Sequence, residues 1–103
     1  MRYVVIGDSM EPMLQEGDKI FANTLIYKIR KPRVNEIILF IHPHYRKKIL
    51  VKRITRQEND MVWVESDNNT HAHQDSKTFG WIAKKSILGR ASFRYWPIYK
   101  SLT

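Results

Sequence analysis

Short stretches in which apolar and polar residues alternate run through most of this chain. In residues 19–25, Ile20 and Ala22 fall on one side of an extended backbone, and Phe21 and Asn23 fall on the other. Successive side chains of a strand point to opposite faces, so this alternation predicts a strand with one buried face. Few stretches show the 3.6-residue period of a helix.

Turn residues divide the pattern into several such strands. Asn59-Asp60 separates residues 48–56 from residues 61–65, which predicts a hairpin. The apolar run 37–41 predicts a buried strand, which Pro43 ends. The remaining expected strands are residues 3–6, 79–82 and 87–95, with a possible bulge at Gly89 and a long polar loop at 66–77. Many short strands predict an all-β fold, either a barrel or a sandwich.

The composition limits the class of protein. The chain has 103 residues, so a single domain over residues 1–103 is expected. It has no cysteine, which excludes disulfides and thiolate metal sites. No apolar run approaches the length of a membrane span, and the apolar start at residues 3–6 is too short for a signal peptide. These features predict a cytoplasmic protein.

The charge points to anionic partners without choosing among them. The formal net charge is +8, which nucleic acid, an anionic membrane surface or an acidic protein could all exploit. The basic residues do not form one helical stripe, and no DNA-reading motif is present. We therefore expect no nucleic-acid partner, whereas contact with a membrane surface remains open.

Two segments carry candidate chemistry. Ser9 follows the flexible pair Gly7-Asp8, and Lys52 shares a predicted strand face with Leu50 and Ile54. Burial disfavours the ammonium form of lysine, and a useful base near pH 7–8 needs a pKa about three units below the free value. The plain alternatives are a turn or N-cap role for the serine and a lysine that extends over apolar surface with its charge in water.

These segments resemble the conserved boxes of the type I signal peptidases, which use a serine and a lysine. Residues 7–14 resemble the nucleophile box, and residues 51–54 resemble the lysine box. The closing box resembles residues 66–68, 75–77, 79–80 and 89–91, in the same order along the chain. The resemblance implies the fold shared by signal peptidases and LexA-like proteins, with catalytic β-barrel-like sheets.

The resemblance also implies roles for the reacting groups. Ser9 would be the nucleophile, and its backbone N–H would donate to the oxyanion. Lys52 would be the general base, and Ser76 would hydrogen-bond the lysine amine and orient it. Some members carry a second oxyanion donor where Gly7 stands here, so this site would rely on backbone amides. No metal and no cofactor is implied.

Further residues would support the site. We expect Met10 to insert into the core beneath the turn and Pro12 to restrain the turn. The resemblance implies that Asp67 and Asn68 form a structural turn near the site. It also implies that Asp75 holds the closing loop, with Arg53 or Arg90 as candidate partners.

The implied activity is removal of a leader or signal-like N-terminal segment from a precursor protein by a serine endopeptidase. Residues 42–43, 62–68 and 94–97 look similar to maturation proteases of nickel-type superoxide dismutase, which makes that precursor a candidate substrate.

Two other classes of function are possible. A self-cleaving repressor domain would share the fold and the dyad, but no helix-turn-helix fits before Ser9, and the chain lacks the Ala-Gly or Cys-Gly bond that such repressors cut. A non-catalytic basic β-barrel that binds nucleic acid would show binding that weakens steeply with salt.

Four histidines form two His-x-His pairs, His42/His44 and His71/His73. Residues i and i+2 of an extended chain point the same way, so each pair could chelate a metal ion. Pro43 interrupts the first pair, and no carboxylate cluster completes a site. Solvated loop histidines are the favoured interpretation.

Overall fold

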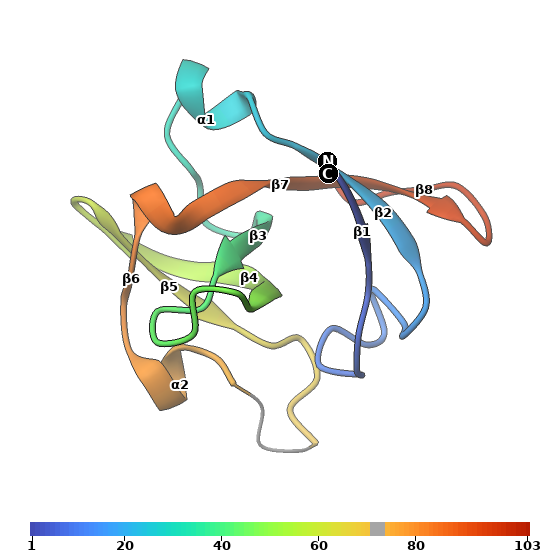
Figure 1. The fold of residues 1–103 in the computed structure, drawn as a ribbon, viewed down its shortest axis with the longest axis horizontal. Coiled ribbons are helices and arrows are strands. Elements are labelled where there is room, and N and C mark those ends of the chain that lie inside the picture. Colours follow the sequence, from blue (N-terminus) through green and yellow to red (C-terminus); the bar gives the residue numbers. More distant parts are fainter. Residues whose placement is uncertain (71–73) are drawn as a thin grey trace.

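The computed structural model describes residues 1–70 and 74–103 and confirms the all-β fold (Figure 1). One antiparallel sheet runs in the order β1-β2-β7-β3-β4-β5-β6, with β8 paired to β7. Its end strands, β1 and β6, do not pair with each other in this described part, so the barrel-like sheet is open. The elements are β1 (Arg2–Val4), β2 (Lys19–Asn23), α1 (Ile26–Ile29), β3 (Ile37–Ile41), β4 (Ile49–Glu58), β5 (Met61–Glu65), α2 (Ser76–Phe79), β6 (Ile82–Ala83), η1 (Lys84–Ser86), β7 (Ile87–Trp96) and β8 (Lys100–Ser101).

Strand β3 occupies the centre of the sheet and separates two apolar clusters. Ile37 and Leu39 pack into one cluster with residues from β1, β2 and the loop that follows β1. Ile38 and Phe40 pack into the other, with residues from β4, β5 and β6. A strand buried on both faces needs apolar side chains at every position, which explains the unbroken run at residues 37–41.

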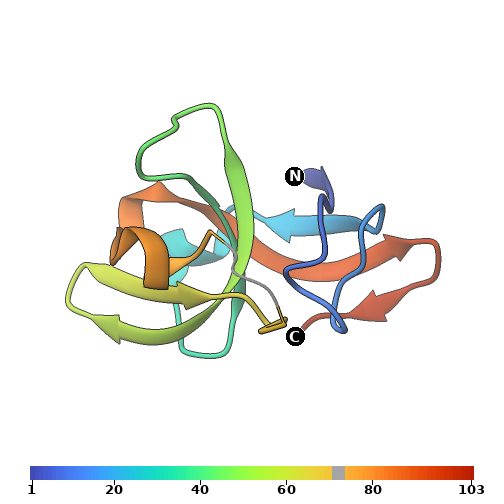
Figure 2. The same cartoon turned by 90° about the horizontal axis from the view of Figure 1, so that it is seen from below.

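Strand β7 joins the two halves of the molecule (Figure 2). Its first residues pair with β3, and its later residues pair with β2. The register shifts between Leu39 and Phe40, where Leu88 is the extra residue on β7, so a bulge lies beside Gly89 as predicted. A Cβ atom on Gly89 would lie 2.6 Å from the Asn23 carbonyl oxygen, so this close approach requires glycine.

The short elements differ most from the sequence-based expectation. The strand predicted at residues 79–82 is wrong at its start, because Phe79 ends helix α2. Strand β8 and helix α1 were not predicted at all. Elements of two to four residues give no periodic signal, and tertiary contacts decide them. In the described residues, no helix has both the length and the apolar character needed to cross a membrane.

Candidate active site

Ser9 lies in a compact loop that connects β1 to β2. The loop is closed at its base, where the Gly17 amide donates to the Val5 carbonyl at 2.8 Å and the Val5 amide donates to the Asp18 carbonyl at 2.9 Å. Met10 is buried beneath it in the first apolar cluster, as expected. Gly7 has φ +78°, a left-handed conformation that favours glycine, two residues before the serine.

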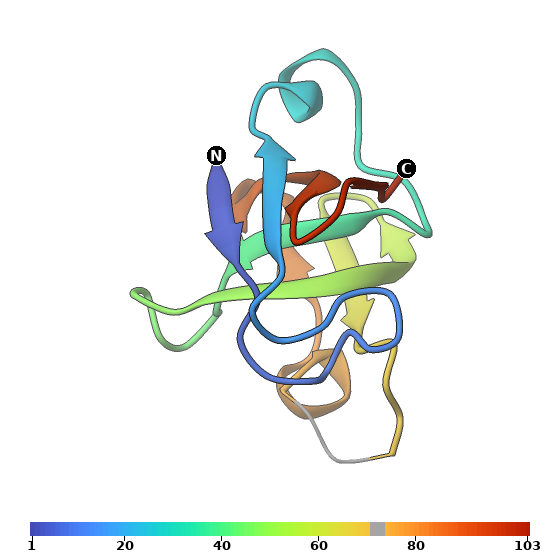
Figure 3. The ribbon, with the colours of Figure 1, turned by 90° about the vertical axis from the view of Figure 1, so that its right-hand side faces the viewer.

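Pro12 is exposed in this loop and follows a cis peptide bond from Glu11. Asn68 ties the loop to the segment after β5, and the two segments lie side by side in Figure 3. Its backbone amide donates to the Ser9 carbonyl at 2.9 Å, and its side-chain amide donates to the Asp8 carbonyl at 3.0 Å. The predicted turn at Asn68 therefore holds the backbone of Ser9 itself, a contact that the sequence did not indicate.

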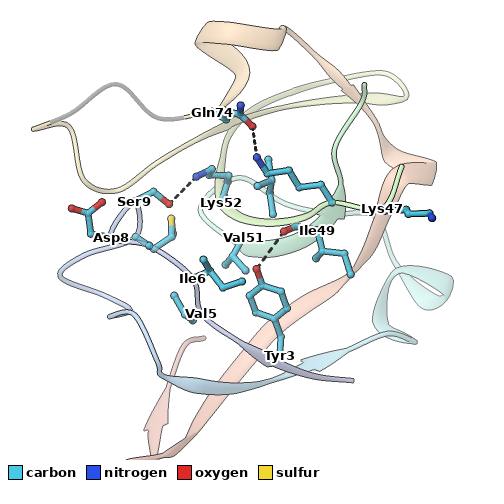
Figure 4. A pocket seen from close by; sticks show the side chains of 14 residues that line it. Tyr3, Val5, Ile6, Asp8, Ser9, Lys47, Ile49, Val51, Lys52 and Gln74 are labelled. Carbon is cyan, nitrogen blue, oxygen red and sulfur yellow. Dashed lines mark hydrogen bonds between the residues drawn. The ribbon is translucent and has the colours of Figure 1, made fainter. Parts of the chain in front are cut away.

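Lys52 reaches Ser9 from strand β4, where it pairs with Ile38 of β3. Its side chain is only 4% exposed, because it leaves the strand on the face of Leu50 and Ile54, toward the second apolar cluster. The Lys52 Nζ atom lies 2.8 Å from the Ser9 Oγ atom (Figure 4). The two residues are 43 positions apart in the chain and in hydrogen-bond contact in the fold.

The environment of Lys52 favours its neutral form. Burial is the largest cause and lowers the pKa of Lys52 to about 8. The negative charge of Asp75 raises this pKa, whereas the positive charge of Lys48 lowers it further. Within residues 1–70 and 74–103, no carboxylate forms an ion pair with Lys52 Nζ. With a pKa near 8, about a tenth of the amine is neutral at pH 7.

Arg53, the next residue of β4, has a purely structural set of contacts. Its Nε and Nη2 atoms donate to the two carboxylate oxygens of Asp67, each at 2.9 Å. Its Nη1 atom donates to the Asn35 carbonyl at 2.7 Å. This bidentate pair attaches the turn at Asp67 and Asn68 to β4, which holds the Ser9 loop and the Lys52 strand together.

No hydrogen bond or ion pair of the described residues joins Asp75 to Arg53 or Arg90, which differs from the expectation. Its carboxylate accepts from the Lys77 amide at 2.9 Å, as the N-cap of α2, and from the Ser66 amide at 3.1 Å. Arg53 is already occupied by Asp67, and Arg90 pairs with a glutamate before β3. Asp75 nevertheless holds the closing segment, and its charge acts on Lys52.

Ser76 is buried at the start of α2, directly after Asp75. Its hydroxyl accepts a hydrogen bond from the Val64 amide at 2.8 Å. Among the hydrogen bonds of the described residues, none joins Ser76 to Lys52. The orienting contact implied by the resemblance is thus not formed in this structure. Ser76 fastens α2 to β5 instead.

The histidines do not form a metal site in the described part of the chain. His42 is buried, which corrects the expectation of a solvated loop residue. Its Nδ1 atom accepts from the His44 amide at 3.0 Å, and its ring contacts Phe79 and Tyr45. In residues 1–70 and 74–103, no three side chains of metal-ligand type gather. The pair His71 and His73 lies outside the described residues.

A groove of about 490 Å³ opens beside the Ser9–Lys52 contact. Residues 5–10 line one wall, and residues 47–52 line the other (Figure 4). The Tyr3 hydroxyl donates to the Ile49 carbonyl at 3.3 Å and joins the two walls. Lys48 and Gln74 also line the groove. Sequence reasoning missed these three lining side chains, because only the fold brings residues 3, 48 and 74 together.

Comparison with known proteins agrees with this arrangement. The sequence profile described as signal peptidase, peptidase S26, matches residues 1–68. The chain belongs to the signal peptidase family. Its relatives include an Arabidopsis thaliana mitochondrial ATP-independent inner membrane protease subunit 1a, 30% identical, with 90% of this chain and 68% of the relative aligned.

Two other relatives of this family show how far the similarity extends. The chloroplastic thylakoidal processing peptidase 1 of Arabidopsis thaliana is 27% identical over 86% of this chain but only 40% of its own length. Signal peptidase I of Bacillus caldolyticus is 26% identical, over 92% of this chain and 79% of its own length. This chain therefore spans less than half of the thylakoidal enzyme. The matched family region contains Ser9, Lys52, Asp67 and Asn68, and ends before Asp75.

Proposed function

We propose that this protein is a serine endopeptidase that removes a leader or signal-like segment from a precursor protein, with Ser9 and Lys52 as its catalytic dyad. The observation that carries the proposal is the 2.8 Å contact between Ser9 Oγ and a buried Lys52 amine whose pKa lies near 8. A nucleophile within hydrogen-bond reach of a base of suitable pKa meets the requirement for covalent catalysis.

The proposed first half-reaction begins with neutral Lys52. Its amine accepts the hydroxyl proton while Ser9 Oγ forms a bond to the substrate carbonyl carbon. The Ser9 backbone N–H, which makes no hydrogen bond within the described chain, is the proposed donor to the oxyanion. The tetrahedral intermediate collapses when the carbon–nitrogen bond breaks, and Lys52 returns its proton to the leaving amine. The product is an ester between Ser9 and the leader.

The second half-reaction uses the same base. Lys52 accepts a proton from water, whose oxygen attacks the ester carbonyl, and the Ser9 oxygen leaves with that proton. The products are the free leader carboxylate and regenerated enzyme. Asn68 supports both steps because it donates hydrogen bonds to the Ser9 and Asp8 carbonyls. The Asp8 carbonyl faces Asn68, so the Ser9 N–H of the same peptide unit points away from Asn68.

The groove suits an extended peptide. Residues Ile49–Lys52 pair with β3 on one side, and β5 joins β4 only from Arg53 onward. The other edge of residues 49–52 therefore has no strand partner in the part of the chain that the structure describes. A substrate segment that adds to this edge would gain main-chain hydrogen bonds and lie beside Ser9.

The proposed first substrate to test is the precursor of a nickel-type superoxide dismutase. The support is the similarity of residues 42–43, 62–68 and 94–97 to proteases that mature that enzyme. The direct experiment incubates the purified protein with candidate precursors from the same genome and maps the new N-terminus of each product. Cleavage at one position by the wild type, and none by Ser9→Ala, is expected. Equal cleavage by both proteins would refute the dyad.

We also propose contact with an anionic membrane surface. Exposed apolar side chains gather on β1, β2 and the β7–β8 hairpin, where Trp96 is 52% and Tyr99 is 69% exposed. Val4, Lys19 and Trp96 are neighbours across these strands, and Lys19 Nζ lies 5.1 Å from the Trp96 ring centroid. Exposed aromatic rings beside lysines are typical of the membrane–water interface.

Cosedimentation with vesicles tests the membrane contact. Binding to vesicles that contain anionic lipid is expected to fall in Trp96→Ser, and to fall with added salt because surface charge is screened. The matched control is Trp81→Ser, since Trp81 packs against Trp63 away from this hairpin. Binding that is equal for all three proteins would rule out a membrane role for this surface.

A further inference from the structure

The two ends of the groove differ in charge. Asp8 lines the groove next to Ser9, whereas Lys47 and Lys48 line the opposite end of the β4 wall. Both lysines are exposed, as is Gln74, whose side chain contacts that of Lys48. A peptide that occupies the whole groove therefore passes from an acidic side chain at the reacting end to basic side chains at the far end.

The Lys48 side chain has one polar partner among the described residues, and that partner carries no charge. Its Nζ atom donates to the Gln74 side-chain oxygen at 2.9 Å. Gln74 is neutral, and none of the ion pairs of the described residues includes Lys48. The Lys48 charge lowers the pKa of both Lys52 and His42, so it is felt toward the interior of the site as well as in solvent. The ammonium group is thus accessible, has a neutral polar partner, and forms no ion pair with a carboxylate of the described residues.

The spacing of residues along β4 sets the distance between Lys48 and Lys52, the residue next to Ser9. Lys48 precedes β4 directly, and Lys48, Leu50 and Lys52 alternate onto one face of an extended chain. Four residues of extended chain span about 13 Å. A substrate strand that pairs with this edge of β4 has the same rise per residue as β4. The substrate residue opposite Lys48 therefore lies four positions from the substrate residue opposite Lys52.

We propose that Lys48 and Gln74 form a specificity subsite for an acidic side chain in the leader, four residues before the residue whose carbonyl is attacked. This inference rests on the proposed leader-peptidase function. In the proposed first half-reaction the leader stays bound to Ser9 as an ester, so the groove that leads away from Ser9 is assigned to the leader side of the cleaved bond. An aspartate or glutamate there would pair with the Lys48 ammonium and accept from the Gln74 side-chain amide.

The neighbouring lysine provides a matched control. Lys47 carries the same charge one residue earlier, but its side chain points away from Gln74 and from the Ser9–Lys52 contact (Figure 4). Replacing either lysine by glutamine removes one positive charge from the same end of the protein. Only Lys48→Gln removes the charge that contacts Gln74.

The experiment uses three leader peptides that differ only at this position, with Asp, Asn or Lys. Cleavage is measured with the wild type, Lys48→Gln and Lys47→Gln, and the Asp-to-Asn ratio of kcat/KM is compared, because this ratio cancels any change in the basicity of Lys52. We expect about a fivefold preference for Asp in the wild type, as for a partly exposed ion pair. The preference should vanish in Lys48→Gln, persist in Lys47→Gln, and shrink at high salt.

Binding of the same peptides to the Ser9→Ala protein, measured by fluorescence anisotropy, separates this inference from the proposed function. A Lys48-dependent preference for Asp in binding, without any cleavage by the wild type, would support the subsite and overturn the peptidase. Cleavage with equal ratios for Asp and Asn would overturn the subsite alone. A preference that survives in Lys48→Gln, or that Lys47→Gln abolishes equally, would also overturn it.

Discussion

Two buried ionisable groups lie near neighbouring positions of β3 and β4, and their surroundings differ. Glu36, 6% exposed, immediately precedes β3 and is enclosed by donors. Arg30 forms a bidentate ion pair with it, Arg90 Nη1 lies 3.2 Å from its carboxylate, and the Tyr27 hydroxyl donates to it at 3.0 Å. Lys52 is as deeply buried. Among the described residues, its ammonium group hydrogen-bonds to the neutral Ser9 hydroxyl.

The difference appears in the protonation of each group. Burial alone would raise the pKa of Glu36, but hydrogen bonds from Arg30, the Arg33 amide and Tyr27, with the Arg90 charge, lower it. For Lys52, burial lowers the pKa to about 8, and Asp75 opposes this only in part. A buried charge with matched partners stays charged and supports the fold. A buried charge without them is held near its titration point, where it can exchange a proton.

The largest effect that separates the two centres is on activity. Lys52→Met removes the proposed base while keeping an unbranched side chain of similar length, so kcat is expected to fall about ten-thousandfold. Steady-state cleavage of the mapped precursor measures it, with Lys47→Met as the control at an exposed lysine of the same strand region. Loss of less than tenfold would exclude Lys52 as the base.

The next largest effect is on stability and concerns Glu36. Glu36→Ala leaves Arg30 and Arg90 without their shared carboxylate, so the free energy of unfolding is expected to fall by about 3–5 kcal/mol. Urea unfolding measures the change. Glu16→Ala removes an exposed carboxylate and should change stability by less than about 0.5 kcal/mol. Equal effects of the two variants would contradict a structural role for the Glu36 ion pairs.

Whereas Glu36→Ala should lower the free energy of unfolding, Lys52→Met should raise it at neutral pH. The pKa of Lys52 is about 8 in the fold, below its ordinary value of 10.5. Below pH 8 both states hold the proton, and burying the charge costs the fold at most about 3 kcal/mol. Between pH 8 and 10.5 only the unfolded state holds it, so wild-type stability rises with pH. Above pH 10.5 both states are neutral, and this cost disappears.

Unfolding experiments at pH 7 and pH 10 test this linkage. Lys52→Met should be more stable than the wild type at pH 7, and the advantage should shrink at pH 10. Lys47→Met, at an exposed position, should show no such dependence on pH. An advantage of Lys52→Met that is the same at both values would mean that the buried amine is not titrating.

The smallest expected effect concerns the pH dependence of cleavage. The rate should rise with pH through about 8, as Lys52 loses its proton. Asp75→Asn removes the charge that raises the pKa of Lys52, so the rise should move to lower pH. The side-chain oxygen of asparagine can still cap α2. A pH–rate profile of kcat/KM measures the shift, and movement to higher pH would contradict the assigned influence of Asp75.

Local sequence patterns were enough to predict much of the fold. Alternation and turn signals predicted the all-β fold, the strands 37–41 and 61–65, and the bulge beside Gly89, because these depend on local periodicity and backbone sterics. The order of the boxes indicated Ser9 and Lys52 as a pair, and the apolar neighbours of Lys52 indicated its burial. Met10 was also expected beneath the turn that carries Ser9, and it is buried there.

The pairing of polar groups depends on how the strands and loops pack against one another. Arg53 and Arg90 were the candidate partners of Asp75, but Arg53 pairs with Asp67 and Arg90 pairs with Glu36. Asp75 accepts from a helix amide instead. The clamp from Asn68 to Ser9 and the bond from Lys48 to Gln74 join segments distant in sequence. Hydrogen bonds depend on distance and angle to a few tenths of an ångström, and residue order along a chain does not specify those quantities before the strands are packed.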